Sequence, residues 1–286
     1  MAWQVSIGTN LYRGYELDVA LNSLQRCGAR YVDLDFLGGL EFEETVDLAH
    51  VTEQDLDAPD GIRNMLAERD LQVVTFSGHM DLSREENLPL YFRKMEFAAA
   101  LSIRVIGAFS GPVERKTALL KNLERVGSRA EDLNLIVALE TESPGDVVFC
   151  GRAGAEVLAE LDSTRIGLCY DTGNIYYANA GRIDLVEDLG ACRNLVRSMH
   201  CKDAYWEGSW YRYGAVGEGI FDYAAISEAV RAPADPIPLT VEIPYYLKSQ
   251  DWKPFTVEAE SRPLEELERM VRTSLVNLGE HFPLGQ

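Results

Sequence analysis

The chain has 286 residues and a formal net charge of -19, from 46 acidic and 27 basic residues, and this charge would repel a nucleic-acid backbone and an anionic membrane surface. Hydrophobic residues make up 47% and charged residues 26% of the composition, which excludes a disordered chain and provides material for a packed core. We therefore expect a globular protein that binds neither nucleic acid nor membranes.

Eight short runs rich in β-branched and aromatic residues are predicted to be strands, and segments of helical period alternate with them along the whole chain. The predicted strands are residues 3–8, 30–35, 72–77, 104–109, 134–140, 165–170, 196–200 and 238–242. The predicted helices are residues 16–27, 90–101, 116–133, 153–161 and 264–278. In the first helix, Leu17, Ala20, Leu21 and Leu24 form one stripe, and Gly28 follows as a stop signal.

This alternation is typical of βα units built around a parallel sheet. Eight units over 286 residues give about 36 residues per unit, close to the size that a (β/α)8 barrel requires. An open doubly wound sheet is the alternative, but no G-x-G-x-x-G follows the first predicted strand. We predict a single (β/α)8 TIM-barrel domain over residues 1–286.

The cysteines and the amino-terminal segment bear on the compartment. Five cysteines are scattered along the chain and never occur as C-x-x-C, so neither a disulfide framework nor a zinc knuckle is predicted. Residues 1–7 contain no basic segment followed by an apolar one, and no run reaches the roughly 18 apolar residues of a membrane span. We expect a cytoplasmic protein.

Four predicted strands in the second half of the chain end on or next to an acid or a histidine, namely Glu140, Asp171, His200 and Glu242. Active sites of TIM barrels lie at the carboxyl ends of the strands. The separations of 31, 29 and 42 residues are close to one βα unit each, so these side chains are predicted to be neighbours. Strand alternation puts Glu140 on the face of Ala138, which points into the barrel mouth.

Three carboxylates and an imidazole in a dry cavity would repel one another strongly without a cation. A set of ligands rich in oxygen suits Mn²⁺, Mg²⁺ or Co²⁺ better than a metal that prefers thiolates. Each residue taken alone could be an isolated polar group satisfied by backbone or water. The shared spacing of all four favours one divalent-metal site.

The segments around these residues resemble signatures of sugar isomerases and epimerases in the xylose-isomerase-like superfamily. They are Leu139-Glu140-Thr-Glu142, Tyr170-Asp171-Thr-Gly-Asn174, His200-Cys-Lys202-Asp203, Gly217-Glu-Gly219-Ile-Phe-Asp222 and Val241-Glu242. The resemblance implies that Glu140, Asp171, His200 and Glu242 bind one divalent metal, with Mn²⁺ the first choice. It also implies that Glu140 and Glu242 are catalytic and exchange a proton alpha to a ketose carbonyl through an enediolate, which the metal stabilises.

The sequence departs from the pattern of this superfamily at two positions. Asn174 and Glu142 stand where many relatives carry a histidine, and both positions belong to the substrate shell. The sugar therefore stays open, and so does the choice between epimerisation and isomerisation. A metal-dependent lyase of the inosose or dehydroshikimate dehydratase type, or a relative that cleaves carbon–glycoside bonds, is an alternative. A carbohydrate-binding subunit without turnover is another.

Five residues are candidates for substrate contacts: His79, Glu142, Asn174, Lys202 and Arg212. His79 follows the third predicted strand, where a plain loop histidine is the alternative. Lys202 could contact a substrate oxygen or pair with a carboxylate, and Arg212 could bind an acidic substituent or lie at the surface. We expect a small carbohydrate as the substrate and a homo-oligomer as the assembly, with a hetero-subunit left open.

Further polar and aromatic residues have structural interpretations. Asp33 and Asp35 share a strand face and are interpreted as buried, hydrogen-bonded acids, although Asp35 could reach the site. Asp203 and Asp222 are predicted to fix loops or orient the histidine, and the segment 217–219 is interpreted as a family loop, not a phosphate turn. Six aromatic residues could stack on a sugar or line a subunit interface: Trp206, Trp210, Tyr211, Tyr213, Tyr245 and Tyr246.

Overall fold

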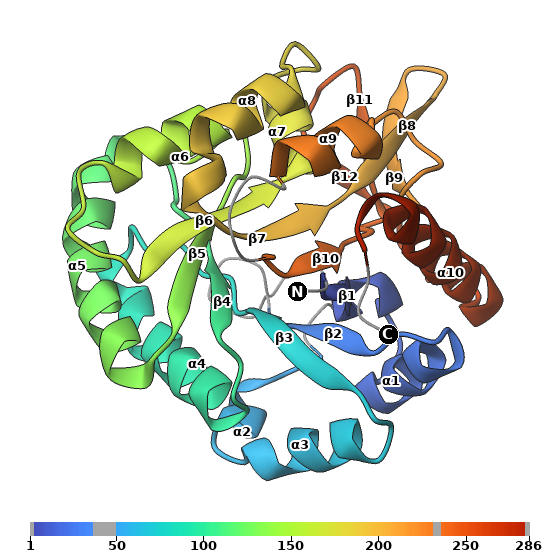
Figure 1. Ribbon diagram of the computed structural model, residues 1–286, viewed down its shortest axis with the longest axis horizontal. Coiled ribbons are helices and arrows are strands. Elements are labelled where there is room, and N and C mark those ends of the chain that lie inside the picture. The colour runs from blue at the N-terminus through green and yellow to red at the C-terminus, as the bar shows by residue number, and fades with distance from the viewer. Residues whose placement is uncertain (1–2, 37–49, 231–235, 284–286) are drawn as a thin grey trace.

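The computed structural model describes residues 3–36, 50–230 and 236–283, and it confirms the predicted (β/α)8 barrel. Eight parallel strands close in the order β1-β10-β7-β6-β5-β4-β3-β2 (Figure 1). They are β1 (Val5–Gly8), β2 (Tyr31–Asp35), β3 (Gln72–Ser77), β4 (Val105–Ala108), β5 (Ile136–Glu140), β6 (Ile166–Asp171), β7 (Val196–Cys201) and β10 (Leu239–Val241). The first and last of these strands pair with each other, which completes the ring.

Helices surround the barrel on the outside (Figure 1). They are α1 (Leu17–Arg26), α2 (Glu53–Leu56), α3 (Pro59–Ala67), α4 (Leu88–Ala100), α5 (Lys116–Leu133), α6 (Gly151–Leu158), α7 (Thr172–Ala178), α8 (Leu185–Cys192), α9 (Tyr223–Val230) and α10 (Leu264–His281). The stripe predicted for the first helix is buried in the core. The fourth helix begins two residues earlier than predicted because Pro89 fits its first turn, where a missing backbone N–H costs nothing.

The two faces of each barrel strand point into different environments, as strand alternation requires. Val137 and Leu139 of β5 are fully buried in the main core, which includes the helix side chains. Ala138 belongs to a separate cluster with Val105 and Cys169 from the neighbouring strands. Glu140 follows on the Ala138 face, so the alternation predicted for this strand is confirmed.

Strand register brings the carboxyl ends together. Asp171, the last residue of β6, lies opposite His200 of β7, and His200 in turn lies opposite Thr240 of β10. The last barrel strand is shorter than predicted and ends at Val241. Its successor Glu242 still donates its backbone N–H to the carbonyl of Cys201, at 3.3 Å, so the side chain keeps its place beside β7.

A second sheet, which the sequence did not predict, lies outside the barrel. It is antiparallel, has the order β12-β11-β9-β8, and consists of β8 (Asp203–Glu207), β9 (Trp210–Gly214), β11 (Leu247–Gln250) and β12 (Thr256–Val257). The segments after β7 and β10 form it. Gly208, at φ +63°, opens the two-residue turn between β8 and β9, a conformation that glycine adopts without strain.

The aromatic residues of this outer sheet mostly pack on one another. Tyr211 and Tyr213 are buried, with ring centroids 5.4 Å apart at 78°, and Tyr177 and Phe255 complete the same cluster. Trp206 is the partly open member, at 39% exposure. Tyr211 and Tyr213 thus belong to a small core of their own, whereas Tyr245 and Tyr246 are buried in the main core, and the predicted roles in sugar stacking or a subunit interface stay predictions.

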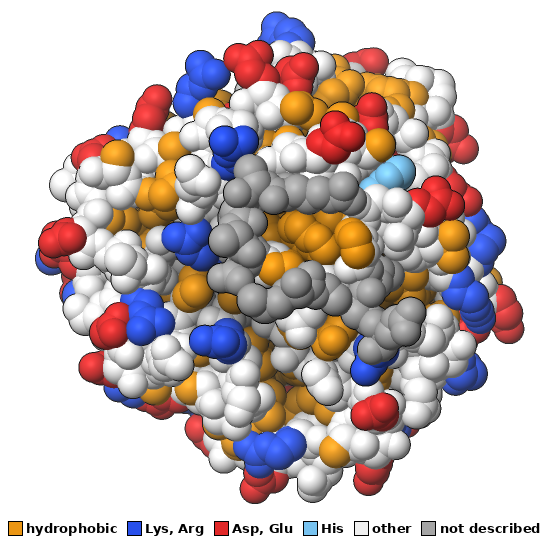
Figure 2. Space-filling view, viewed as in Figure 1, with side chains coloured by type: hydrophobic (Ala, Val, Ile, Leu, Met, Phe, Trp, Pro, Cys, Tyr) orange, Lys and Arg blue, Asp and Glu red, His pale blue; other side chains and the backbone are white. Residues whose placement is uncertain are grey.

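Charged side chains of both signs are spread around hydrophobic areas on the face drawn in Figure 2. A cavity of about 850 Å³ lies at the amino-terminal ends of the barrel strands, lined among others by Gln4, Gln72, Arg104 and Arg197. The acidic side chains singled out above lie at the opposite end of the barrel. Across the described ranges, no helix is both long and apolar enough to cross a membrane.

Candidate metal centre

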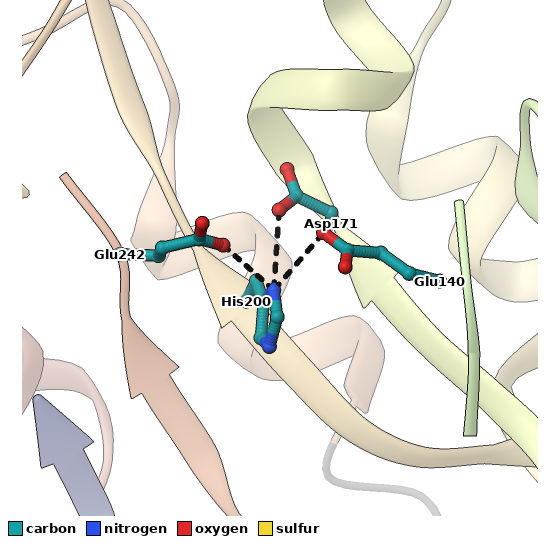
Figure 3. A group of neighbouring side chains, drawn as sticks. All are labelled: Glu140, Asp171, His200 and Glu242. Atoms are coloured by element: carbon teal, nitrogen blue, oxygen red, sulfur yellow. Dashed lines mark hydrogen bonds and ion pairs between the residues drawn. The ribbon is translucent and has the colours of Figure 1, made fainter. Parts of the chain in front are cut away.

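The four side chains predicted to be neighbours lie together at the carboxyl ends of their strands (Figure 3). Glu140, Asp171 and His200 end or nearly end β5, β6 and β7, and Glu242 follows β10. Each residue offers one ligand atom, and these atoms all lie within 4.8 Å of one another. The parallel strands therefore deliver four ligating groups to one point.

The imidazole of His200 lies among the three acids (Figure 3). Its Nδ1 is 2.7 Å from Glu242 Oε2, 3.1 Å from Glu140 Oε1 and 3.5 Å from Asp171 Oδ2. Glu140 and Glu242 approach this nitrogen from opposite sides in the view. The three carboxylates thus surround one position.

Two of the three acids, Glu140 and Glu242, stay ionised despite burial, whereas burial raises the pKa of Asp171 against the lowering effect of the Lys202 charge. Glu140 is 1% exposed and Asp171 is fully buried. Burial by itself disfavours the charged form of Glu140, but His200 and His79 outweigh it and hold the pKa of that carboxyl well below its usual value. Burial likewise opposes ionisation of Glu242, and the charges of Lys202 and His200 lower its pKa to about 2. The cluster is therefore a group of buried carboxylates with little access to water.

Lys202 is the lysine that pairs with these carboxylates. Its Nζ is 2.9 Å from Asp171 Oδ2 and 3.2 Å from Glu242 Oε2. Burial lowers the pKa of a lysine, but the surrounding carboxylates raise that of Lys202 well above its usual value, so it stays charged. Of the two roles left open from the sequence, the structure shows the ion pair. Substrate contact by Lys202 stays a prediction.

Asn174 and Glu142, the two departures from the superfamily pattern, contact each other. Asn174 donates from Nδ2 to Glu142 Oε1 and to Glu140 Oε1, at 3.1 Å each. The backbone N–H of Asn174 donates to Asp171 Oδ1 at 2.8 Å, which caps α7. Lys202 Nζ donates to Asn174 Oδ1 at 2.9 Å. The amide of Asn174 thus connects Glu140 and Glu142 to Lys202. A histidine at this position could not do the same, because an imidazole cannot donate to both acids and also accept from the lysine.

His79 also lies at the cluster. Its Nε2 is 2.7 Å from Glu140 Oε2, and its ring stacks on Phe109 with centroids 4.5 Å apart. Gly107 makes room for it, because a Cβ at residue 107 would lie 2.7 Å from His79 Nε2. His79 is therefore a partner of Glu140, and its predicted contact with substrate stays a prediction.

The residues present fit a divalent cation. The donor set is one imidazole nitrogen and three carboxylates, the ligands that Mn²⁺, Mg²⁺ and Co²⁺ accept. Three buried oxygens, Glu140 Oε2, Asp171 Oδ2 and Glu242 Oε2, have close basic neighbours in His79, Lys202 and His200, but none of these contacts within the described residues has hydrogen-bond geometry. With His200 neutral, as a metal ligand must be, Lys202 does not balance the three carboxylates, so the cluster is a candidate site for a divalent cation.

Comparisons with known proteins agree with this fold. The family model described as "Xylose isomerase-like TIM barrel" matches residues 21–271. The chain belongs to this family. No curated protein matches the chain significantly.

Solved structures of the xylose isomerase-like family superpose on nearly the whole chain. The IOLI protein with a bound zinc atom is 15% identical, with a TM-score of 0.73 over 98% of this chain and 100% of that one. D-psicose 3-epimerase in the presence of D-fructose is 14% identical, with a TM-score of 0.72 over 97% and 99%. D-allulose 3-epimerase from Methylomonas sp. in complex with D-allulose is 15% identical, with a TM-score of 0.71 over 98% of both chains. At this identity the likeness concerns the fold alone.

Arg212 is the one predicted site residue that the structure does not bring to the cluster. It lies in β9 of the outer sheet, with Nε 2.8 Å from Glu207 Oε2 and Nη2 2.9 Å from Glu258 Oε1. Lys248 shares Glu258 at 2.9 Å. The guanidinium is thus already paired, and binding of an acidic substituent by Arg212 stays a prediction.

The family loop after β9 is fixed by Asp203. Its carboxylate accepts the backbone N–H groups of Gly217 at 2.9 Å, Gly219 at 3.0 Å and Phe221 at 3.3 Å. A Cβ at Gly219 would lie 2.1 Å from Asp203 Oδ1, so only glycine fits there. The backbone donors are therefore used by the protein itself, in agreement with the structural interpretation of this segment.

Sequence reasoning missed one residue of the site, Asn10. It follows β1 in the short helix η1 (Thr9–Tyr12), and its Nδ2 donates to Glu242 Oε1 at 2.7 Å. The signal was present, because Asn10 is a polar residue just after a predicted strand. Applying the strand-end rule to the first strand as well as to the last four would have found it.

Proposed function

We propose that this member of the family is a metal-dependent isomerase or epimerase that transfers a proton alpha to the carbonyl of a ketose. Glu140, Asp171, His200 and Glu242 would hold one divalent cation, with Mn²⁺ the first choice and Mg²⁺ or Co²⁺ possible alternatives. The observation that carries this proposal is the pair of ionised carboxylates, Glu140 and Glu242, on opposite sides of one buried ligand position (Figure 3).

Two carboxylates so placed suit proton exchange on either face of a carbon held between them. Glu140 and Glu242 would act as the base that removes the proton and the acid that returns it. When bound, the cation supplies Lewis-acid polarisation of the carbonyl oxygen, which stabilises the enediolate. Return of the proton to the opposite face gives an epimer, and return to the adjacent carbon gives the aldose.

The rest of the cluster would keep these two carboxylates in their charged forms. His79 contacts Glu140, and Lys202 contacts Glu242, so each carboxylate has a cationic or hydrogen-bonding partner of its own. Burial keeps most bulk water away and so strengthens the electrostatic interactions of these carboxylates with a bound cation. Under this proposal the substrate is a small free sugar, like the D-fructose and D-allulose present in the structures of the similar D-psicose and D-allulose 3-epimerases.

Solvent exchange tests the proposal directly. The Mn²⁺-loaded protein is incubated in D₂O with D-fructose, D-allulose or L-ribulose, and the products are examined by NMR and mass spectrometry. Deuterium at the alpha carbon without loss of water supports the proposal. An unsaturated product identifies a lyase, and the absence of both exchange and metal binding identifies a non-catalytic protein; either result contradicts the proposal.

Glu140→Gln and Glu242→Gln are each expected to slow exchange by about 10² to 10⁴-fold, the usual contribution of a positioned acid or base. Glu124→Gln, which changes an exposed acid on α5, is the matched control and should exchange at the wild-type rate. Wild-type exchange in either site variant would remove Glu140 or Glu242 from the assigned role.

A further inference from the structure

Asn10 is the contact through which the first strand reaches the metal centre. The side chain is 1% exposed, and its amide donates to Glu242 Oε1 at 2.7 Å across 232 residues of sequence. Glu242 is the most exposed of the four ligating residues, with 13% of its side chain accessible. It also lies one residue beyond its strand, so it needs a partner to fix the rotation of its carboxylate.

The hydrogen bond defines the orientation of the amide. An ionised carboxylate can only accept, so the amide of Asn10 must present its NH₂ group to Glu242. The amide oxygen Oδ1 accepts no hydrogen bond from any described residue. A Cβ at Gly8 would lie 2.9 Å from this oxygen, so the glycine leaves the space that the amide occupies. Among the described residues, Glu242 is the side chain to which the amide of Asn10 donates a hydrogen bond.

The backbone of Asn10 is held as firmly as its side chain. Its N–H donates to Asp35 Oδ2 at 3.0 Å, and the N–H of Asp35 donates to Thr9 Oγ1 at 3.0 Å. These two bonds tie the end of β1 to the end of β2. Asp35 therefore supports the site indirectly, as a buried, hydrogen-bonded acid.

The two oxygens of Glu242 then have different partners. Oε1 accepts from Asn10, whereas Oε2 faces His200 Nδ1 at 2.7 Å and Lys202 Nζ at 3.2 Å. We propose that Asn10 is a positioning residue that locks the Glu242 carboxylate with Oε2 toward the cation. The assignment of Glu242 as an acid–base group rests on the proposed function, but its orientation as a ligand does not.

The experiment measures Mn²⁺ affinity and exchange kinetics in Asn10→Ala and Asn10→Leu. Leucine fills nearly the same volume without the donor, so it separates the hydrogen bond from packing. Asn122→Ala is the matched control, since Asn122 is equally buried and its amide donates to the carbonyl of Leu82 at 2.8 Å and not to one of the four candidate ligands. Calorimetric titration of the metal-free proteins with MnCl₂ gives the affinities, and circular dichroism checks folding.

Both Asn10 variants are expected to bind Mn²⁺ about 10 to 100-fold more weakly, the usual effect of removing a group that orients a metal ligand. Exchange on D-fructose or D-allulose, whichever the wild type accepts, should lose kcat by a similar factor with KM changed less than about twofold. Asn122→Ala should keep the wild-type Mn²⁺ affinity even if its melting temperature falls.

The two proposals fail in different ways. A wild type that binds Mn²⁺ but exchanges no sugar proton contradicts the proposed function, and a weaker affinity in both Asn10 variants would still support positioning. Wild-type Mn²⁺ affinity in a folded Asn10→Leu protein overturns the positioning role whatever the reaction is. Loss of affinity in Asn10→Ala but not in Asn10→Leu also overturns it, because packing would then explain the effect.

Discussion

Two groups of charged side chains in this protein differ in their burial and in their balance of acidic and basic residues. At the barrel mouth, three acids face the single lysine Lys202 in a buried volume. On the outer sheet, Arg212 and Lys248 face Glu207 and Glu258, so the charges cancel. A balanced group at the surface needs no further ion, whereas a buried group with three carboxylates around one position is a candidate site for a cation. The contrast explains why only the first group is a candidate site.

Substitution of one basic side chain in each group should give the largest difference in stability between the two groups. Lys202→Met leaves Asp171 and Glu242 buried without their partner, and we expect a loss of about 3–5 kcal/mol in the stability of the metal-free protein. Arg212→Met removes two ion pairs near the surface, with Glu207 and Glu258, and should cost about 0–1 kcal/mol for each. Urea unfolding in the presence of EDTA measures both. Equal losses would show that burial does not distinguish the two groups.

Added Mn²⁺ should stabilise the protein through the group at the barrel mouth and not through the group on the outer sheet. Mn²⁺ at about 100 times its dissociation constant is expected to add about 2.7 kcal/mol to the stability, because it binds the folded chain alone. Glu140→Gln should lose most of this gain, and Glu258→Gln should keep it. Thermal melts with MnCl₂ and with EDTA give the difference. A melting curve indifferent to both reagents would argue against any metal at the barrel mouth.

The smallest expected effect is a loss of the stability that the outer-sheet ion pairs contribute as the pH falls. Hydrogen bonds from Arg212 first, and then from Lys248, lower the pKa of Glu258 to about 2, below the ordinary 4.5. Because the folded-state pKa lies below the unfolded one, the stabilisation is complete above about pH 4.5 and disappears as the pH falls toward 2. The stability difference between wild type and Glu258→Gln should therefore shrink from pH 5 to pH 2. A difference independent of pH would contradict this assignment.

The barrel was predictable because its signals are local and repeated. Each βα unit carries its own alternation of strand and helix, and the rule that sites lie at strand ends pointed to Glu140 and His200 before any coordinate was known. The outer sheet was not predictable in the same way. Its strands, such as β8 and β11, are short and come from two separate loops, so their pairing depends on the barrel that holds those loops together.

The strand-end rule could have indicated Asn10 as a site residue, but its partner at the other end of the chain could not be predicted from the sequence. The bond from Asn10 to Glu242 exists only because β1 pairs with β10, and nothing in either segment names the other. The same holds for the pairing of Arg212 with Glu258, which removed a predicted substrate residue from the cluster. Long-range register decides such contacts, and local pattern carries no information about it.

Closure of the ring by its first and last strands has a consequence for biosynthesis. A nascent chain that has emerged only as far as β7 already carries Glu140, Asp171 and His200, yet it lacks Glu242. A cation held by all four residues could therefore be bound only after translation has passed β10. Metal capture would then report that the strands carrying the four residues have assembled, before α10 needs to have formed.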